Sequence, residues 1–179
     1  MLYVFGFERT GVAVGDLYLV DPEPEPGQEG AERGVRVEVR LLERGPLPGS
    51  IYSARPIEVT RPVWRADLLE SVDGPPRSFD RTHYHPAMQG WEPGPRIFDS
   101  DLQALPVEWV GARLAGLEGL LAEAGIAADP AYARDAEALR GCLVEIMDTV
   151  SRLLERVWRG EAATPPAGPE LAEARVGWL

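Results

Sequence analysis

Both histidines of the 179-residue chain lie in one short segment, Arg81-Thr82-His83-Tyr84-His85. In an extended backbone alternate side chains share a face, so Arg81, His83 and His85 would lie together, with the two histidine Cα atoms about 7 Å apart. Histidine is the side chain whose ordinary pKa lies near neutral pH, and neutral imidazole is a common metal ligand. The segment is therefore the first candidate for a catalytic or metal-binding site.

Two kinds of chemistry fit this segment. The two histidines and a carboxylate would bind a divalent metal such as Zn²⁺, Fe²⁺ or Mn²⁺ and leave a coordination position open. Alternatively, the histidines would act as acid and base on a phosphodiester, as in RNA cleavage without a metal, while Arg81 or Arg65 stabilises the developing charge. A structural interpretation stays open beside both, in which the histidines only form hydrogen bonds with neighbouring carbonyl groups. The sequence requires no cofactor, and the cofactor that this segment could bind is a divalent metal.

The remaining residues of such a site follow from their positions. Asp67 and Arg65 share one face of a preceding predicted strand, and antiparallel pairing would place them opposite the histidines. The candidates for catalysis are His83, His85, Arg81 and Asp67. The candidates for metal ligation are His83, His85 and Glu92, with Asp67 and Asp80 as other carboxylates within reach.

The order Gly74, His83-x-His85, Glu92 and Gly94 resembles the first motif of the cupin family, which has glycine, His-x-His, glutamate and glycine in that order. The resemblance covers residues 74–94. The intervals in this chain are longer than in that motif, and no histidine follows residue 85 to complete a second motif. No ligand is therefore assigned from the resemblance.

A second candidate site is the positive charge between residues 33 and 65. This stretch holds seven arginines and three glutamates, whereas the whole chain has a formal charge of −11. Arginine forks bind carboxylate or phosphate groups through two hydrogen bonds, which makes Arg36, Arg40 and Arg65 candidates for anion binding. The alternative is that they pair with the chain's own carboxylates on a solvated face. The acidic overall charge argues against general affinity for nucleic acid or anionic membranes and leaves RNA as a minor candidate.

The residue types that the chain lacks exclude several enzyme classes. It has neither lysine nor asparagine, and all 18 basic residues are arginine, which indicates a GC-rich bacterial genome. A Schiff base, a Walker A lysine and a lysine general base are therefore unavailable. The sequence also has no Gly-x-Gly-x-x-Gly segment that opens a helix and no Gly-x-Ser-x-Gly elbow.

The elements expected to position the candidate residues change type near residue 105. The first part has period-2 alternation, clearest where Val35, Val37 and Val39 alternate with arginine and glutamate. From Pro106 on, apolar residues follow 3,4 spacing. The sequence predicts an α+β fold, with a mainly antiparallel sheet of five to seven strands at about 2–99 and a long two-helix antiparallel hairpin at about 106–159. Strands are expected at 2–7, 12–20, 34–42, 50–59, 62–72 and 79–85, and helices at 106–124 and 130–159.

The length fits one domain. Within 1–179 we expect a β-rich part at 1–105, a helical part at 106–160, and a linker with a short tail at 161–179. The single cysteine, Cys142, cannot form an internal disulfide, the N-terminus lacks a signal-peptide pattern, and no stretch is apolar enough to span a membrane. These features predict a soluble cytoplasmic protein.

The second predicted helix carries two apolar faces, a heptad-like stripe from Ala136 to Val157 and a second face that includes Cys142. One face can pack on the first helix, which leaves the other for the sheet or for another subunit. The interface candidates are Leu139, Ile146, Met147, Val150, Leu154 and Trp158. The sequence therefore favours a protein-interaction role, by self-association or with a partner protein and accessory or regulatory in kind. An enzyme centred on Arg81, His83 and His85 is the alternative.

Overall fold

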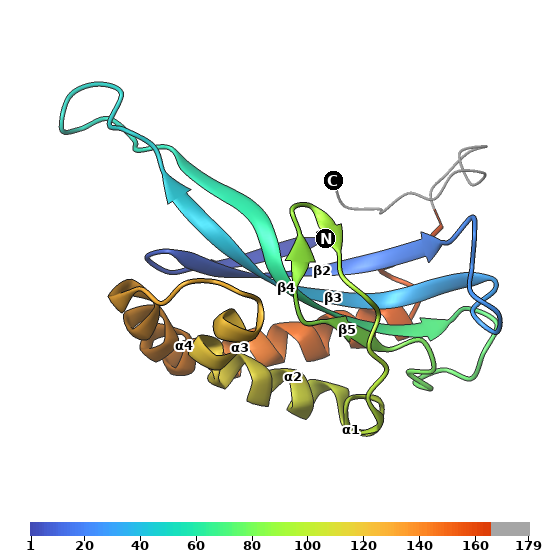
Figure 1. The fold of residues 1–179 in the computed structure, drawn as a ribbon. Coiled ribbons are helices and arrows are strands. Elements are labelled where there is room, and N and C mark those ends of the chain that lie inside the picture. The colour runs from blue at the N-terminus through green and yellow to red at the C-terminus, as the bar shows by residue number, and fades with distance from the viewer. Residues whose placement is uncertain (166–179) are drawn as a thin grey trace.

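The computed structural model describes residues 1–165, so the predicted C-terminal tail lies outside the described residues. Five antiparallel strands form one sheet in the order β1-β2-β3-β4-β5, and helices cover one face of it (Figure 1). A two-stranded hairpin of β6 and β7 stands above the other face. The predicted α+β fold is confirmed.

The strands are β1 (Leu2–Gly6), β2 (Thr10–Val20), β3 (Ala31–Arg44), β4 (Ile57–Ser71), β5 (His83–His85), β6 (Met88–Gln89) and β7 (Glu92–Pro93). The helices are α1 (Ser100–Ala104), α2 (Pro106–Ala115), α3 (Leu117–Glu123) and α4 (Pro130–Trp158).

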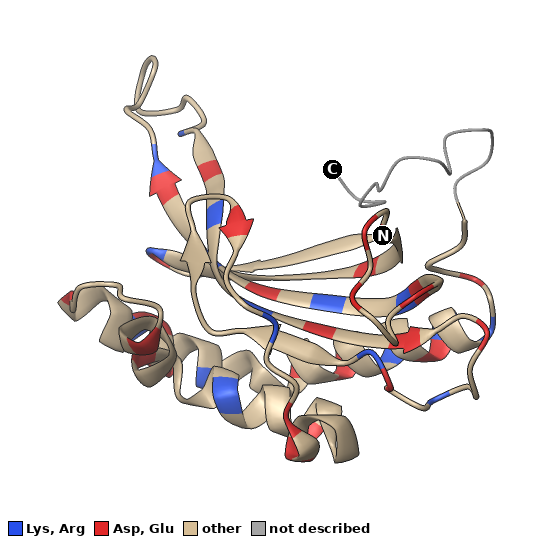
Figure 2. Ribbon diagram, turned by 45° about the vertical axis from the view of Figure 1, so that its right-hand side comes forward, with Lys and Arg blue, Asp and Glu red and all other residues tan. Residues whose placement is uncertain are grey.

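Alternation along the central strands separates an apolar face from a polar one. Val35, Val37 and Val39 of β3 are fully buried in the core that the helices cover. Their neighbours Arg36 and Glu38 point to the opposite face, where Figure 2 shows basic and acidic residues following one another along the strands. This polar face is itself largely buried, which already sets it apart from a solvated sheet surface.

The predicted division of residues 50–72 into two strands is wrong. The runs at 50–59 and 62–72 were expected as two strands, but β4 is continuous from residue 57 to 71, and residues 50–56 form a turn. β4 passes through Pro62, which lies opposite Arg40 where the β3–β4 register is irregular. A proline has no N–H to donate to a ladder, and a bulge accommodates it without ending the strand.

The first predicted helix is also divided. It was expected at 106–124, but α2 and α3 meet at Gly116, whose φ of −95° and ψ of 38° are not helical. Glycine costs about 1 kcal/mol relative to alanine inside a helix, which makes it a favourable place for such a break. α4 begins as predicted, with Asp129 as the N-cap and Pro130 in the first turn.

α4 is the main support of the sheet and packs against α2, β2 and β3. Besides its apolar stripe, it carries the buried carboxylate of Asp135. Asp135 accepts hydrogen bonds from the backbone N–H groups of Glu8, Arg9 and Thr10 and from the Thr10 hydroxyl, at 2.8 to 2.9 Å. This carboxylate thereby joins the β1–β2 turn to the helix.

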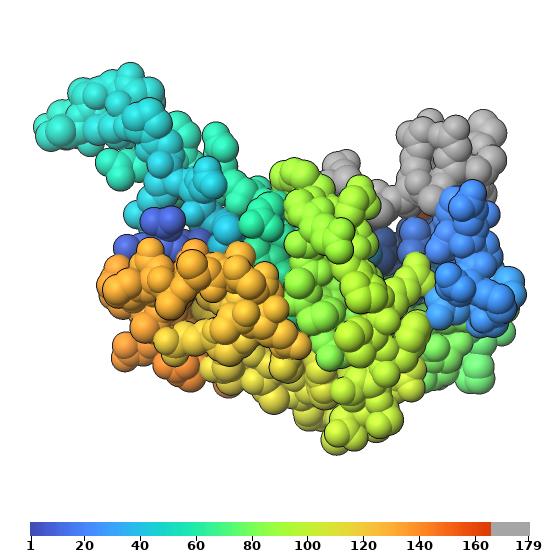
Figure 3. Space-filling model, viewed as in Figure 1, coloured from blue at the N-terminus to red at the C-terminus, as the bar shows by residue number. Residues whose placement is uncertain are grey.

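β3 and β4 extend past the other strands and end in a hairpin that projects from the body (Figures 1 and 3). Ile51 and Tyr52 near its tip are 82% and 92% exposed. Among the residues that the structure describes, no helix has the length and apolar composition needed to cross a membrane.

Candidate metal centre

Three neighbouring strands bring the candidate residues together on the polar face of the sheet. In the antiparallel register Asp67 of β4 lies opposite His83 of β5, and Arg65 lies opposite His85. On the other side of β4, Arg36 of β3 lies opposite Asp67. The predicted pairing of the histidines with Asp67 and Arg65 therefore has the register that the sequence suggested.

Both histidines are held in one tautomer by the backbone. The Nδ1 of His83 lies 2.8 Å from the carbonyl oxygen of Arg81, and the Nδ1 of His85 lies 2.7 Å from that of Gly94. A carbonyl oxygen can only accept, so each Nδ1 must carry the proton and donate it. In neutral imidazole the other nitrogen, Nε2, is then an unprotonated acceptor.

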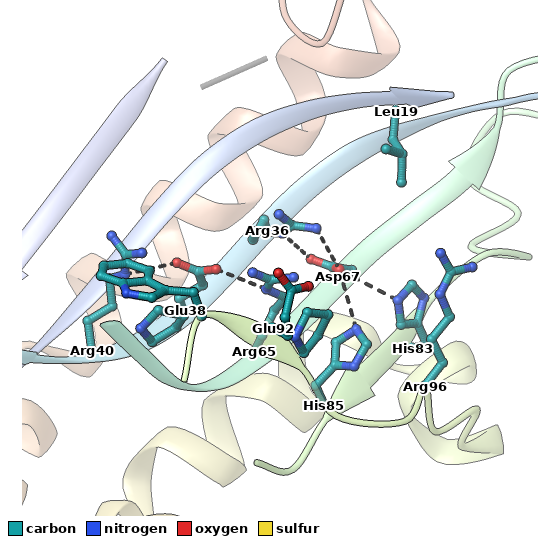
Figure 4. Close-up of a pocket in the computed structure, with 13 residues that line it drawn as sticks. Leu19, Arg36, Glu38, Arg40, Arg65, Asp67, His83, His85, Glu92 and Arg96 are labelled. Carbon is teal, nitrogen blue, oxygen red and sulfur yellow. Dashed lines mark hydrogen bonds and ion pairs between the residues drawn. The ribbon is translucent and has the colours of Figure 1, made fainter. Parts of the chain in front are cut away.

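The free nitrogens face an ionised carboxylate instead of a hydrogen-bond donor. Nε2 of His83 lies 3.5 Å from Oδ2 of Asp67, and Nε2 of His85 lies 3.9 Å from the same oxygen (Figure 4). The three ligand atoms lie within 4.8 Å of one another, and all three residues are at most 3% exposed. Three acceptor atoms of buried residues therefore converge here, and a cation between them would remove their mutual repulsion.

Arg36 fixes the orientation and the charge of Asp67. Its Nε donates to Oδ1 of Asp67 at 2.6 Å and its Nη2 donates to Oδ2 at 2.9 Å, an ion pair buried from solvent. Burial alone would raise the pKa of the Asp67 carboxyl, but the charge and hydrogen bonds of Arg36 outweigh it and hold this pKa well below its usual range. Asp67 is therefore ionised at every physiological pH.

The two imidazoles are neutral at pH 7. Burial lowers the pKa of both, and it lowers that of His85 to about 4, although the negative charge of Asp67 opposes the shift. Neutral imidazole and ionised carboxylate are the forms that coordinate a metal, so the ligands need not lose a proton first.

The metal-free protein is expected to lose stability as the pH falls from about 6.5 to 4. An unfolded histidine titrates near pH 6.5 and His85 in the folded chain near 4, so in this window the unfolded state binds more protons. The contribution of His85 is complete above pH 6.5, and about 3 kcal/mol of unfolding free energy is lost toward pH 4, with His83 acting in the same direction.

Urea unfolding at a series of pH values measures this loss. Asp67 stays ionised in the folded chain across this window, and its own contribution is lost only below about pH 5, where the unfolded carboxyl begins to bind a proton, so the slope between pH 6.5 and 5 reports the imidazoles. The His85→Gln variant should flatten the curve. A wild-type curve that is level between pH 6.5 and 4.5 would contradict the prediction.

A cavity of about 430 Å³ opens beside the three ligands. Its floor is the polar face of β3 and β4, and its wall is the β6–β7 hairpin with Trp91 and Glu92 (Figure 4). On the floor Glu38 accepts from Nε of Arg65 at 2.9 Å and pairs with Nε of Arg40 at 3.1 Å. The site is thus a buried ligand cluster at the bottom of a pocket large enough for a small molecule.

The structure separates two predicted residues from the cluster. Arg81 precedes β5 in a turn, and its guanidinium donates to the carbonyl oxygens of Gly27 and Glu29, which attaches the 21–30 loop to the body. Glu92 is on the rim of the pocket, and the cluster contains Asp67 as its carboxylate. Arg81 lies outside the strand, because β5 starts at His83, so the alternation of side chains between the two faces of the sheet does not place it beside the histidines.

The three predicted anion-binding arginines all line the pocket, but Arg36 is committed to Asp67 and Arg65 shares Glu38. Sequence reasoning missed Arg96, which also lines the pocket and is held by Gln28 and Asp21 of the same 21–30 loop region. Arg96 lies in a segment without strand or helix periodicity, so only its positive charge could have indicated that it belongs to the pocket.

The predicted interface residues lie mostly inside the chain. Leu139, Ile146, Val150 and Leu154 are buried in the core, and Met147 and Trp158 pack against it. Both apolar faces of α4 are therefore occupied by the sheet and the other helices. Self-association remains a prediction, and these side chains no longer support it.

Comparison with protein-family models, with curated proteins and with solved structures gave no match for the chain. Within the described residues, the cluster of Asp67, His83 and His85 and the pocket beside it are the features that point to a function.

Proposed function

We propose that the protein is a zinc-dependent enzyme whose metal is bound by Asp67, His83 and His85 at the bottom of the pocket. The observation that carries the proposal is the convergence of two unprotonated Nε2 atoms and one carboxylate oxygen, each imidazole being oriented by an Nδ1–H bond to a carbonyl group. Such outer hydrogen bonds are typical of histidines that ligate metals, since they fix the tautomer and the ring.

The distances favour tetrahedral coordination. A Zn²⁺ ion about 2.0–2.1 Å from each ligand sets tetrahedral ligand atoms about 3.4 Å apart, whereas octahedral ligands at that length lie about 3.0 Å apart. The Nε2–Oδ2 distances of 3.5 and 3.9 Å are closer to the tetrahedral value. Two nitrogens and one oxygen also suit zinc better than Mg²⁺ or Ca²⁺, which prefer oxygen ligands alone.

The number of ligands favours catalysis over a purely structural metal. Structural zinc sites are closed by four protein ligands, whereas catalytic sites use three and keep a position for water or substrate. Within residues 1–165 the cluster offers three ligands, and all three line the pocket. A water on the fourth position would be acidified toward a pKa of about 7 and supply a hydroxide for hydrolysis.

The same geometry argues against acid–base cleavage without a metal. That mechanism needs one imidazole protonated as the acid and one free as the base near neutral pH. Both imidazoles here are neutral, and both Nε2 atoms point at Asp67. Neither histidine is arranged to deliver a proton to a substrate.

The metal-free protein should bind one Zn²⁺ per chain. Calorimetric titration after treatment with a chelator measures the stoichiometry, and Mg²⁺ at the same concentration serves as the control that should not bind. At a free zinc concentration of about 100 times Kd the folded state gains about 2.7 kcal/mol, which corresponds to a rise in Tm of about 5–10 °C. Binding at less than stoichiometric amounts, or an equal response to Mg²⁺, would contradict the proposal.

A further inference from the structure

We propose that the pocket binds a small organic molecule bearing a carboxylate or phosphate group, with the anionic group held between the metal and Arg65 and the organic part covered by Trp91. The inference rests on the proposed zinc site and names the class of molecule that this site would take. Carboxylate and phosphate groups both present negatively charged oxygens that a metal ion and a guanidinium can bind. Titration with one ligand of each kind distinguishes them.

The pocket has an excess of positive charge when zinc is bound. Its lining contains four arginines and three carboxylates, and Arg96 is also paired with Asp21, so the protein's own charges balance here and a bound Zn²⁺ leaves an excess of two positive charges. The carboxylates on the floor are Asp67 and Glu38, each at most 2% exposed, so solvent does little to screen these charges. In a partly enclosed cleft such an excess raises the local concentration of anions and strengthens their binding.

Arg65 is held in an arrangement that suits an anion. Its Nε is used by Glu38, which holds the planar guanidinium in place at 2.9 Å. Among the described residues neither of its terminal Nη groups has a hydrogen-bond partner, and the side chain is 13% exposed toward the pocket that it lines. A fixed guanidinium with two available terminal groups suits an oxyanion better than a mobile ammonium would.

Arg65 is also placed beside the metal ligands. It is the direct register partner of His85 and stands two residues before Asp67 on the same face of β4. Two residues along a strand correspond to about 7 Å between Cα atoms. One small molecule can therefore reach the open coordination position and Arg65 at the same time.

The organic part of the ligand would pack on Trp91. Trp91 lines the pocket from the turn of the β6–β7 hairpin, yet it is 63% exposed. Its neighbour Gly90 has a φ of 67°, a left-handed conformation that favours glycine and lets the hairpin turn tightly over the pocket. An exposed indole on the rim offers an apolar surface that an inorganic anion would not use, and aromatic or aliphatic groups would pack on it.

The test uses the full chain with and without bound zinc. Phenyl phosphate, benzoate, inorganic phosphate and the uncharged analogue benzyl alcohol are titrated by calorimetry, and zinc content is measured separately on the same samples. We expect phenyl phosphate or benzoate to bind the zinc-loaded protein at least tenfold more tightly than benzyl alcohol. The tighter of the two tells whether the pocket prefers phosphate or carboxylate.

Three variants show which residues contact the bound ligand. Arg65→Lys keeps the charge beside Glu38 but removes the fork, and it should weaken the anions at least tenfold with zinc content unchanged. Trp91→Ala, at an exposed position, should weaken phenyl phosphate or benzoate at least threefold and leave inorganic phosphate unchanged. Arg55→Gln, which removes an exposed arginine from the projecting hairpin, is the matched control and should change nothing.

The outcomes separate this inference from the proposed function. Zinc binding without any preference for anions over benzyl alcohol would overturn the inference and leave the metal site intact. Absence of zinc binding would overturn the metal site and the bridging role, and anion titration of the same metal-free samples would show whether Arg65 alone selects anions. Equal affinities in wild type and Arg65→Lys would exclude Arg65 as the contact.

Discussion

Replacement of His83 by alanine is expected to lower the affinity for zinc more than 100-fold. Loss of a residue that only orients a metal ligand typically costs 10- to 100-fold in affinity, and loss of a ligand itself should cost more. His85→Ala should have an effect of similar size because both Nε2 atoms lie within 4 Å of the same carboxylate oxygen. Competition with a chromophoric zinc chelator measures both affinities.

Glu92→Gln provides the matched control. Glu92 was a predicted ligand and lines the same pocket, but it lies outside the cluster of three, so its variant should keep the zinc affinity within threefold. Circular dichroism establishes that each variant is folded, and His83→Gln fills the buried space if the alanine variant does not fold. If both histidine variants bound zinc as tightly as the wild type, the metal site would be contradicted. The histidines would then have only a structural role, as hydrogen-bond donors to the carbonyl groups of Arg81 and Gly94.

The strand part of the site could be predicted because period-2 alternation is a strong local signal. The valines at 35, 37 and 39 fixed which face of β3 is apolar, and this placed Arg36 on the opposite face. Antiparallel pairing then allowed Asp67 to be placed opposite the histidines from the sequence. These inferences depend only on neighbours in the chain and on one strand pairing.

The rest of the site depends on contacts between distant segments, which periodicity does not encode. Gly94, which orients His85, lies in an irregular segment beyond the strand, and its carbonyl group reaches His85 through the fold of the hairpin. Arg81 was placed in the site because alternation was extended one step too far into a turn. The second apolar face of α4 could not be assigned to sheet or partner, because burial in either environment selects the same residue types.

The buried pair between Arg36 and Asp67 gives the second large effect. Arg36→Met in the metal-free protein should lower the free energy of unfolding by about 3–5 kcal/mol, because it leaves a carboxylate buried without its partner. The replacement keeps a long apolar side chain at a position that is 6% exposed, so little packing volume is lost. Urea unfolding with a chelator present measures the loss.

Two comparisons make this result specific to charge. The double variant Arg36→Met with Asp67→Leu should recover most of the lost stability, since an apolar pair of similar volume often replaces a buried ion pair at little cost. Zinc should stabilise Arg36→Met by more than it stabilises the wild type, because the metal then supplies the positive charge that Asp67 lacks, and it should not stabilise the double variant, which has lost a ligand. If the single variant were as stable as the double variant, Arg36 would not be the group that keeps Asp67 ionised. Asp67 would then not be held by Arg36 in the ionised form that coordinates a metal.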